Sequence, residues 1–496
     1  MPSGVGYARD VTLQLRDRHG VSPVIWMGDE VHDRFARETF PECEVLDWDS
    51  QLNGDDGREM SSQSFDKLSQ YWNSSTFESQ REGLLEELNR YHSPDRIRNL
   101  DREVLLRRLQ SNIFEKILER SPSFFVASET PHNHVFLAAF YLIQWLEIPT
   151  LFFQPTTTLA PALLPKTGLN EVFQGQKVAN LSRQSPSRIL IGETSSLLLE
   201  QLSAGESTLL QRDQRTRLAD QKGRRVSVPR SAWRKIKALL RSSKRQMTWK
   251  RDSFSQAEKG LSMLLEYHRL RLDDEHKLLP SSPSAGTYAF FAMHFQPERT
   301  SVPEGGLKSF QFENFVRARQ LLPSDLTLVI KEHESQVSGI RPGHHGRPFG
   351  LYKLLKSLPN TEVVSAWAKT TELMENSAVV FTLTGSIGIE AALRGIPVVY
   401  FGIPWWAGTP GTYSYHDLKK NESIESLKPA SNKSVRNYLL SVVHEKAIVG
   451  LGTPSGEKFW KRYYDLPPEL YSDAIDQFVE TTRLFISEKV SKSISQ

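Results

Sequence analysis

The sequence has almost no cysteine, since Cys43 is the single one among 496 residues. A disulfide framework and a zinc site built from several cysteines are therefore excluded. Long apolar runs are also scarce, because the most apolar window, residues 135–153, is interrupted by polar residues and a proline. A membrane-spanning helix needs about 20 apolar residues. Residues 1–10 lack the charged start and apolar core of a signal peptide. We expect a cytoplasmic chain that does not cross the membrane and is either free or peripheral at its inner face.

Several familiar catalytic motifs are missing as well. No Walker loop, no Gly-x-Gly-x-x-Gly dinucleotide fingerprint and no nucleophile elbow of a serine hydrolase occurs. Adjacent His344 and His345 point in different directions and have no third ligand at a suitable spacing. The acidic turn at residues 54–57 follows no expected strand and is better explained as a solvated turn. We therefore expect neither a metal site nor a cofactor.

The charge is distributed unevenly along the chain. Residues 211–250 contain fourteen Lys or Arg and two Asp, a formal charge of +12, whereas the whole chain carries +4. No nucleic-acid-binding module accompanies this basic segment, so we expect no nucleic-acid partner. Two interpretations stay open: a solvated basic loop, or a surface for anionic lipid headgroups or an acidic glycan acceptor.

The length and the apolar content predict more than one folded domain. A single core stops growing near 250–300 residues, and 39% of the residues are hydrophobic. The Pro/Ser/Gly-rich stretch at residues 280–286 is the best interdomain linker. We predict an N-terminal Rossmann-like domain at 1–280 with the basic insertion, a C-terminal Rossmann-like domain at 281–430, and a helical extension at 431–496.

Strands and helices alternate along the chain, which is typical of parallel α/β sheets. In the first part we expect strands at 24–28, 124–128, 150–154 and 188–192, helices over about 81–120 and 134–145, and a polar excursion at 47–79. After the linker we expect strands at 288–294, 326–331, 362–364, 379–383 and 398–401, separated by helices near 310–321, 352–357, 371–376 and 387–394. Two more helices are expected in the tail, one ending near 445 and one at 472–487. About five strands with short crossovers predict a doubly wound second domain.

Polar residues follow the first two strands of the second domain, at the edge where open α/β sheets bind ligands. His294, Gln296 and Glu298 follow strand 288–294 and suit recognition of a sugar or a nucleotide; a turn fixed by a proline explains them equally well. Lys331 and His333 follow the next strand and suit a phosphate. The alternative there is an ordinary charged surface loop.

A third cluster joins strand 379–383 to the following helix. Thr384, Gly385 and Ser386 place small side chains and backbone N–H groups at a helix start, which favours phosphate binding. Glu390 lies one turn further on, at a spacing that suits a ribose hydroxyl. A helix cap explains Thr384 and Ser386 equally well, but it does not explain the close glycines Gly385 and Gly388.

The fourth cluster lies in the first domain, between strand 124–128 and helix 134–145. Glu129 and His132 supply a carboxylate and an imidazole, which are the usual groups of acid–base catalysis. The alternative is a capped helix start in which His132 is incidental.

Three blocks of the second domain resemble bacterial capsular and surface polysaccharide biosynthesis proteins. They are residues 291–300 (FAMHFQPERT) followed by Gly305-Gly306, residues 329–333 (VIKEH) and residues 379–402 (VVFTLTGSIGIEAALRGIPVVYFG). The first-domain stretch 128–132 (SETPH), followed by 148–150, is similar to a further block. This family is similar to bacterial Kdo and sialic acid transferases, which implies a GT-B-like α/β fold with two Rossmann-like domains facing across a cleft.

The resemblance also implies roles for the clusters. His333, Thr384, Gly385 and Ser386 would contact the donor phosphate, with Glu390 near the ribose and Lys331 adding charge; His294, Gln296 and Glu298 would line the cleft; and Glu129, His132 and Glu298 would be catalytic. One position departs from the family pattern. Glu334 stands where the family has proline, and a carboxylate beside a phosphate-binding histidine is unfavourable unless it points away.

The expected function is a metal-independent glycosyltransferase. It would move a sugar from a nucleotide-sugar donor to a surface or capsular polysaccharide or its lipid-linked precursor. The resemblance favours a CMP-linked acidic sugar, with UDP- and GDP-sugars as alternatives. Two other functions stay open: a nucleotide-sugar epimerase of the same fold, and a non-catalytic polysaccharide-assembly or polysaccharide-binding protein.

Overall fold

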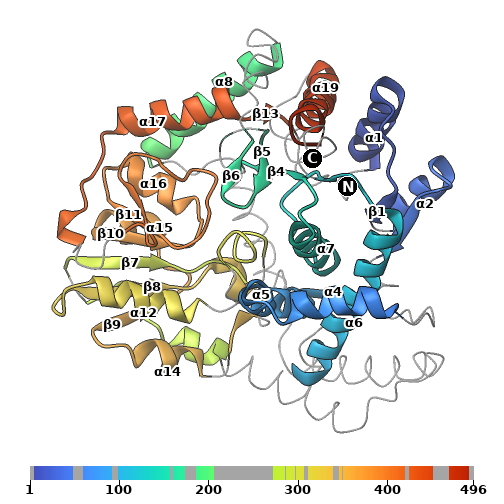
Figure 1. The fold of residues 1–496 in the computed structure, drawn as a ribbon. Helices are drawn as coiled ribbons and strands as arrows, with labels where there is room; N and C mark the ends of the chain where they lie inside the picture. Colours follow the sequence, from blue (N-terminus) through green and yellow to red (C-terminus); the bar gives the residue numbers. More distant parts are fainter. Residues whose placement is uncertain are drawn as a thin grey trace, which may run out of the picture.

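The computed structural model describes fifteen stretches of the chain that form two lobes around separate sheets (Figure 1). The described residues are 5–28, 30–47, 60–91, 99–156, 159, 161–173, 186–205, 272–284, 286–296, 298–306, 311–338, 346–348, 350–418, 424–450 and 468–490. Strands β7 to β11 lie on the left of Figure 1, whereas β1 and β4 lie on the right.

The second lobe has a six-stranded sheet in which every neighbouring pair is parallel. Its strands are β7 (Tyr288–Ala292), β8 (Thr327–Lys331), β9 (Thr361–Val364), β10 (Ser377–Thr382), β11 (Val398–Tyr400) and β12 (Thr412–Ser414). The order β12-β11-β10-β7-β8-β9 corresponds to the doubly wound Rossmann arrangement. Five of these strands match the sequence-based expectation. The sixth, β12, has no strong apolar pattern and was not expected.

The apolar strands of this sheet are buried on both faces. In β7 the side chains of Tyr288 and Phe290 join one core cluster, whereas Ala289 and Phe291 join another. Alternation follows because successive side chains of a strand point to opposite faces. The connecting helices are α12 (Phe312–Leu321), α13 (Glu334–Ser338), α14 (Leu351–Lys356), α15 (Thr370–Glu375) and α16 (Ile387–Leu393).

The first lobe has a less regular, mixed arrangement. Strands β1 (Ile25–Gly28) and β2 (Glu44–Asp47) form a separate parallel pair. In the other sheet β3 (Phe125–Ala127) and β4 (Thr150–Pro155) are parallel, whereas β5 (Ala162–Gly168), β6 (Glu171–Val172) and β13 (Ile448–Val449) join antiparallel. The predicted α/β class is confirmed, and the strand–helix–strand unit from β3 to β4 is parallel, as expected.

Helices account for most of the first lobe. They are α1 (Val5–His19), α2 (Glu30–Thr39), α4 (Ser62–Trp72), α5 (Ser75–Tyr91), α6 (Asn99–Arg120), α7 (His134–Trp145) and α8 (Pro186–Ser203). Helix α7 has the predicted bounds, and residues 134–143 are all buried. Helices α4 and α5 occupy much of the stretch expected to be a polar excursion.

The strand predicted at residues 188–192 is wrong, because these residues lie inside α8. The run Ile189-Leu-Ile191 is apolar but too short for its periodicity to distinguish a strand from a helix. Neighbouring Leu198, Leu199 and Leu202 are buried with Ile191 in the same core cluster. The packing of the whole helix therefore decides the conformation of this run.

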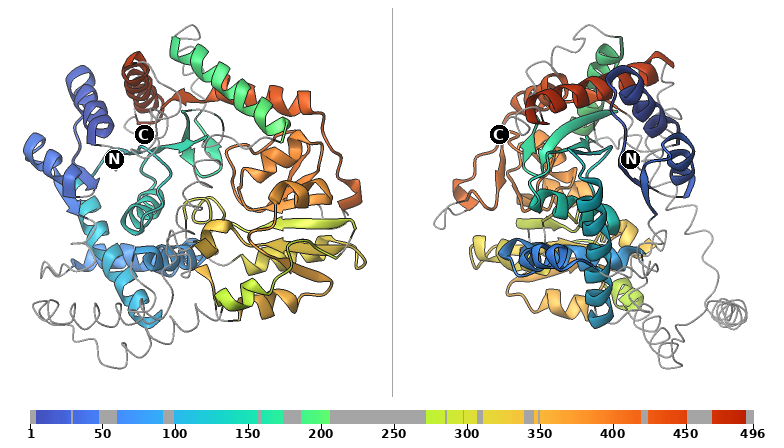
Figure 2. Two further views of the ribbon diagram at one scale, coloured as in Figure 1. Left: turned by 180° about the vertical axis from the view of Figure 1, so that it is seen from behind. Right: turned by 45° about the vertical axis from the view of Figure 1, so that its right-hand side comes forward.

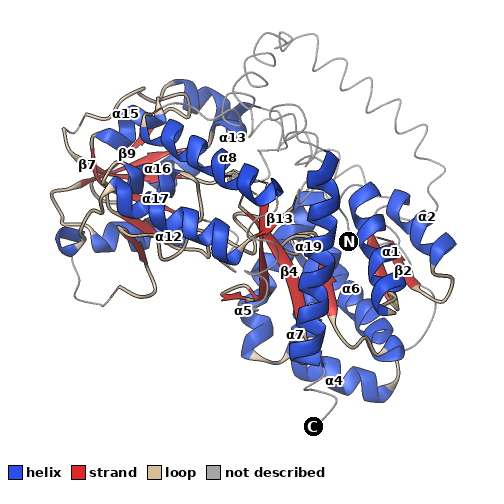
Figure 3. Ribbon diagram, turned by 90° about the horizontal axis from the view of Figure 1, so that it is seen from above, coloured by secondary structure: helices blue, strands red, loops and turns tan. Residues whose placement is uncertain are grey.

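The C-terminal part first runs along the second lobe and then, with β13 and α19, returns to the first lobe. It contains η3 (Ile424–Ser426), α17 (Asn432–Ser441), η4 (Val442–Lys446), β13, α19 (Pro468–Phe485) and η5 (Ile486–Val490). Helix α19 lies beside α1 and near α8 (Figure 2), and seen from above it flanks β13 and β4 (Figure 3). The Tyr471 hydroxyl donates to Asp10 at 3.0 Å, and Arg18 pairs with Asp476 at 2.7 Å. Of the two predicted tail helices, α19 thus completes the first lobe, whereas α17 packs against α16 of the second lobe and against α8.

Candidate active site

The strand order of the second lobe creates one topological switch point, between β7 and β10. The chain leaves β7 toward β8 and β9, whereas β10 leads to β11 and β12 on the other side. Ligands of doubly wound sheets bind at the carboxyl ends of the two strands that flank such a point. His294 follows β7 and Thr384 follows β10, so the structure brings two of the predicted clusters together there.

The His294 imidazole connects these two strand ends through hydrogen bonds. Its Nε2 accepts the backbone N–H of Thr384 at 3.1 Å, and the Thr382 hydroxyl lies 3.1 Å from the same nitrogen. Because the backbone N–H can only donate, Nε2 carries no proton. Burial lowers the pKa of His294 to about 4, and nearby His333 acts in the same direction. His294 is therefore neutral near pH 7 and orders the loop rather than offering a positive charge.

The two glycines of the third cluster are explained by close packing. A Cβ atom on Gly385 would lie 2.9 Å from the Thr382 hydroxyl and 3.1 Å from His294 Nε2. On Gly388 it would lie 2.4 Å from the ring of Trp406, which is fully buried. Such distances require a shift of the neighbouring atoms. The glycine pair therefore no longer argues by itself for a phosphate at this turn.

Two further residues of this cluster contact each other. The Ser386 hydroxyl donates to the Glu390 carboxylate at 3.4 Å, from the start of α16 to its first turn. Glu390 is 9% exposed, so a ribose that binds there must share or replace this contact. The predicted roles of Ser386 and Glu390 stay predictions.

Gln296 lies in a buried network of amide side chains. Its backbone N–H donates to Gln336 at 2.9 Å, and its side-chain oxygen accepts from Gln311 at 2.9 Å. Gln311 also exchanges hydrogen bonds with the backbone of His294 in both directions. Gln296 is 2% exposed, so it shapes the turn after β7 from inside.

The loop that begins at Glu298 links the two strand ends. The Thr300 hydroxyl lies 3.3 Å from Glu298 Oε2, and the Thr300 carbonyl accepts the Thr384 hydroxyl at 2.8 Å. Glu298 is partly buried. It therefore lies near the switch point, and its predicted roles in lining the cleft and in catalysis stay predictions.

At the end of β8, Lys331 and His333 have different surroundings. Lys331 is buried; its ammonium donates to the Thr370 hydroxyl at 2.7 Å and lies 3.5 Å from Glu334 Oε1. His333 is exposed, and its Nδ1 accepts the Ser335 N–H at 3.1 Å. This bond leaves Nε2 as the protonated nitrogen of a neutral ring, which suits donation to a phosphate. Glu334, the departure from the family pattern, is paired with Lys331.

A buried ion pair behind His333 was missed by the sequence analysis. Arg347 Nε lies 2.9 Å from Glu332 Oε1, and the Tyr352 hydroxyl donates to Glu332 Oε2 at 2.7 Å. Arg347 also pairs with Asp273 at 2.9 Å. Burial raises the pKa of Glu332, and the positive charge of Arg347 opposes that shift. Because these residues are far apart in sequence, no local pattern could have revealed the pair.

In the first lobe, the structure brings Glu129 and His132 together at the turn between β3 and α7. His132 Nδ1 lies 2.9 Å from the carbonyl oxygen of Thr130 and 3.9 Å from Glu129 Oε1. A carbonyl oxygen can only accept, so Nδ1 carries the proton and Nε2 is the basic nitrogen of the neutral ring. Asn133 caps α7 by accepting the Val135 N–H at 2.9 Å, so the capped helix start is also real.

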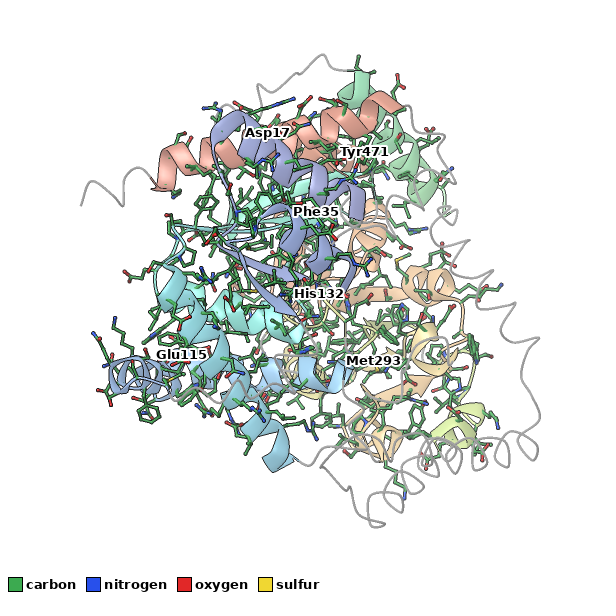
Figure 4. All side chains as sticks on the ribbon, turned by 90° about the vertical axis from the view of Figure 1, so that its right-hand side faces the viewer. Asp17, Phe35, Glu115, His132, Met293 and Tyr471 are labelled. Carbon is green, nitrogen blue, oxygen red and sulfur yellow. The ribbon has the colours of Figure 1, made fainter. Side chains whose placement is uncertain are left out.

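Hydrogen bonds connect this turn directly to the second lobe. The Thr130 hydroxyl donates to Glu304 at 2.8 Å, and the Gln154 amide donates to the Ile403 carbonyl at 3.4 Å. In Figure 4, His132 and Met293, the residue before His294, both lie toward the middle of the molecule. The predicted acid–base turn therefore adjoins the lobe that carries the predicted donor site.

Some predicted features lie outside the described residues: the basic segment at 211–250, the acidic turn at 54–57, and His344 with His345. Within the described part of the chain, no three His, Cys, Asp or Glu side chains are grouped closely enough to hold a metal ion. The helices described there include none with the length and apolar character needed to span a membrane.

The comparison with protein families finds a match to part of this chain. Residues 302–447 match the family described as "Capsule polysaccharide biosynthesis protein". Over this stretch the chain is similar to the capsule family. The matched residues include the ends of β8, β10 and β11, and hence the predicted residues from Lys331 to Glu390.

Curated relatives and solved structures show more distant similarity. The capsule polysaccharide modification protein LipA of Neisseria meningitidis serogroup B is 23% identical over 195 residues, which cover 38% of this chain and 25% of LipA. The match therefore spans about a quarter of the length of that relative. Two structures of Thermosulfurimonas dismutans KpsC are also similar. The beta Kdo 2,7 transferase is 18% identical, the match covers 38% of this chain and 54% of the transferase chain, and the TM-score is 0.21. The beta Kdo 2,4 transferase is 14% identical, the match covers 63% of this chain and 78% of the transferase chain, and the TM-score is 0.27.

Proposed function

We propose that this protein is a glycosyltransferase that moves a sugar from a nucleotide-sugar donor to a capsular or surface polysaccharide or its lipid-linked precursor. The observation that carries the proposal is the juxtaposition of two sites. The switch point of the Rossmann sheet that matches the capsule family lies next to a first-lobe turn where Nε2 is the basic nitrogen of His132. Nucleotides bind at such switch points, and an imidazole can accept the proton of an attacking hydroxyl.

In this proposal the donor lies along the ends of β7, β8 and β10. The exposed His333 donates to a donor phosphate through Nε2, while neutral His294 holds the Thr384 loop in position. Glu390 contacts the ribose, and Ser386 adds a hydroxyl. A CMP-linked acidic sugar is the favoured donor, because the sequence blocks after β7, β8 and β10 resemble those of Kdo and sialic acid transferases.

On the acceptor side, His132 is the general base. Glu129, 3.9 Å from Nδ1, favours the imidazolium that forms when Nε2 takes the acceptor proton. Glu298 lies on the loop that joins the strand ends and would assist from the donor side. The pairing of Glu334 with Lys331 removes the objection that an unpaired carboxylate faces the phosphate.

The test uses purified full-length protein with CMP-, UDP- and GDP-sugars. Binding is measured by calorimetry, and products are measured with and without a glycan acceptor. We expect His132→Ala to lower the transfer rate by a factor of about 10² or more. His333→Ala should weaken donor binding by about 10-fold. The matched control is His19→Ala, which removes an exposed histidine at the end of α1.

The outcomes separate the alternatives. Full activity in both His132→Ala and Glu129→Ala would show that the base is elsewhere. An altered sugar that stays attached to its nucleotide, formed without acceptor, would identify an epimerase. No binding of any of the three nucleotides or their sugars would identify a non-catalytic assembly protein.

A further inference from the structure

Lys166 on β5 is a buried cation for which the predicted site has no role. It is 4% exposed, and its ammonium donates to the side-chain oxygen of Gln154 at 3.1 Å. Among the described residues no carboxylate lies within 4 Å of its Nζ. Burial lowers the pKa of Lys166 to about 8, and the charge of Glu304 offsets part of that shift. A buried ammonium with a single hydrogen bond to the described residues is unusual, because an ammonium can donate three.

The other buried cations near the switch point are paired with carboxylates. Lys331 lies 3.5 Å from Glu334, and Arg347 lies 2.9 Å from both Glu332 and Asp273. Each pair neutralises its own charge. These cations are therefore less available to an anionic ligand than an ammonium with no carboxylate in contact.

Glu304 is shared between two other groups. It accepts the Thr130 hydroxyl at 2.8 Å and lies 3.6 Å from Arg299 Nε. With Lys166 and Arg299, the surroundings of Glu304 hold two cations and one carboxylate. Among the described elements that pack most closely against β5, the other ionisable groups are Glu171 of β6, which accepts from Thr167, and His444, Glu445 and Lys446 of η4.

A chain of contacts connects Lys166 to the predicted site in three steps. Gln154, which accepts from Lys166, donates to the Ile403 carbonyl at 3.4 Å. Ile403 follows Gly402, where an added Cβ atom would lie 2.6 Å from the Thr384 methyl group and 2.5 Å from the Glu304 carbonyl oxygen. Thr130, bonded to Glu304, is adjacent to Glu129. Lys166 thus lies behind the junction between the acid–base turn and the donor loop.

We infer that Lys166 is an anion-binding residue of the interdomain site, and that its ammonium receives an anionic oxygen group of the substrate. That group is either a sugar carboxylate or a donor phosphate. Both would supply the negative charge that the protein leaves out at this position, and both could accept hydrogen bonds from the ammonium in addition to the one that Gln154 accepts. The inference rests on the proposed function for the nature of the substrate, whereas the anion site can be tested without any transfer activity.

The experiment measures binding of four probes to the full-length protein by calorimetry between pH 7.5 and 9.5. The probes are inorganic phosphate, CMP, glucuronate and the neutral sugar glucose. Only the ammonium form binds, so we expect the Kd of at least one anionic probe to rise above pH 8, by up to about tenfold per pH unit. Lys166→Met should weaken that probe about 10-fold or more at pH 7.5. Lys166→Arg should keep the affinity and lose the pH dependence, since arginine stays charged.

Controls and outcomes keep the inference separate from the proposed function. Lys369→Met, at an exposed lysine paired with Glu372, should change nothing. NMR of the 13C-methylated wild-type lysines gives a readout that needs no variant, and the bound probe should raise the pKa of Lys166. If Lys166→Met loses glucuronate binding, the group bound by Lys166 is a sugar carboxylate. If it loses phosphate and CMP binding, that group is a phosphate. Unchanged affinity for every anion in Lys166→Met overturns the inference, even if CMP binds and transfer proceeds. Lys166-dependent glucuronate binding without any nucleotide binding would keep it and refute the proposed function.

Discussion

Replacement of Gly388 by alanine distinguishes a packing role of the glycine pair from a ligand-binding role. The added methyl carbon would lie 2.4 and 2.5 Å from two atoms of the Trp406 ring, well inside van der Waals contact. Trp406 is fully buried and packs edge-on against Tyr400 at 5.3 Å, so the ring cannot swing out into solvent. Overpacking of this kind costs about 1–3 kcal/mol. We expect Gly388→Ala to lower the free energy of unfolding by that amount.

The assay is urea unfolding followed by tryptophan fluorescence, combined with calorimetric titration of CMP. Trp406→Phe, which shortens the ring, should also lower stability because it leaves a cavity. The double variant should be more stable than the sum of the two losses predicts, with a coupling of roughly 0.5–3 kcal/mol. Gly286→Ala is the control, because no atom lies within 4 Å of its added Cβ.

Nucleotide binding then decides between the two roles. If Gly388 serves packing, the double variant recovers stability and CMP affinity together. If it recovers stability but still fails to bind CMP, the glycine is needed for close approach of a phosphate and the packing explanation is wrong. A stability change below about 0.5 kcal/mol in Gly388→Ala would also refute the reasoning.

Three further predictions concern buried ionisable groups. His294 has a pKa of about 4 in the folded protein against an ordinary value of 6.5, so its contribution to stability is complete above pH 6.5 and is lost as the pH falls toward 4, by up to about 3 kcal/mol. The acid-unfolding curves of wild type and His294→Gln should diverge between pH 6.5 and 4, and parallel curves would contradict this prediction. Burial also lowers the pKa of Lys166, from 10.5 to about 8, so the buried ammonium destabilises the folded state fully below pH 8 and no longer above pH 10.5. Lys166→Met should therefore raise the unfolding midpoint at pH 7, and this gain should disappear above pH 10.5. Arg347→Met should cost about 3–5 kcal/mol because it leaves Glu332 buried without its partner, and the additional change Glu332→Gln should recover part of that loss.

Much of the second lobe could be predicted from the sequence. Strand β7 is a continuous apolar run, and all five residues from Tyr288 to Ala292 are buried or nearly so. Helix α7 was located within its bounds because its start combines Asn133 as a cap with an apolar segment. Local composition is sufficient to predict such elements, since the conformational preference of their residues agrees with the burial of the element in the fold. The run at 188–192 shows the limit, because four or five apolar residues fit either a strand or a helix.

The candidate site was predicted only as separate strand-end clusters. The sequence placed His294, His333, Thr384 and His132 after strands, and this followed from local patterns. It could not show that His294 is neutral and bonded to the Thr384 N–H, because burial and tertiary contacts cause that pKa shift. Nor could it show that Glu334 pairs with Lys331, since either direction of that side chain fits the same residues.

The sequence by itself determined the α/β class, most elements of the second lobe, and the capsule-family blocks. These depend on neighbouring residues and on periodicity, both of which are local. Only the tertiary structure decided the strand order and its switch point, the return of β13 and α19 to the first lobe, and the contacts of Thr130 with Glu304 and of Gln154 with Lys166. Burial energies and hydrogen bonds between residues hundreds of positions apart set those features, and no local pattern encodes them.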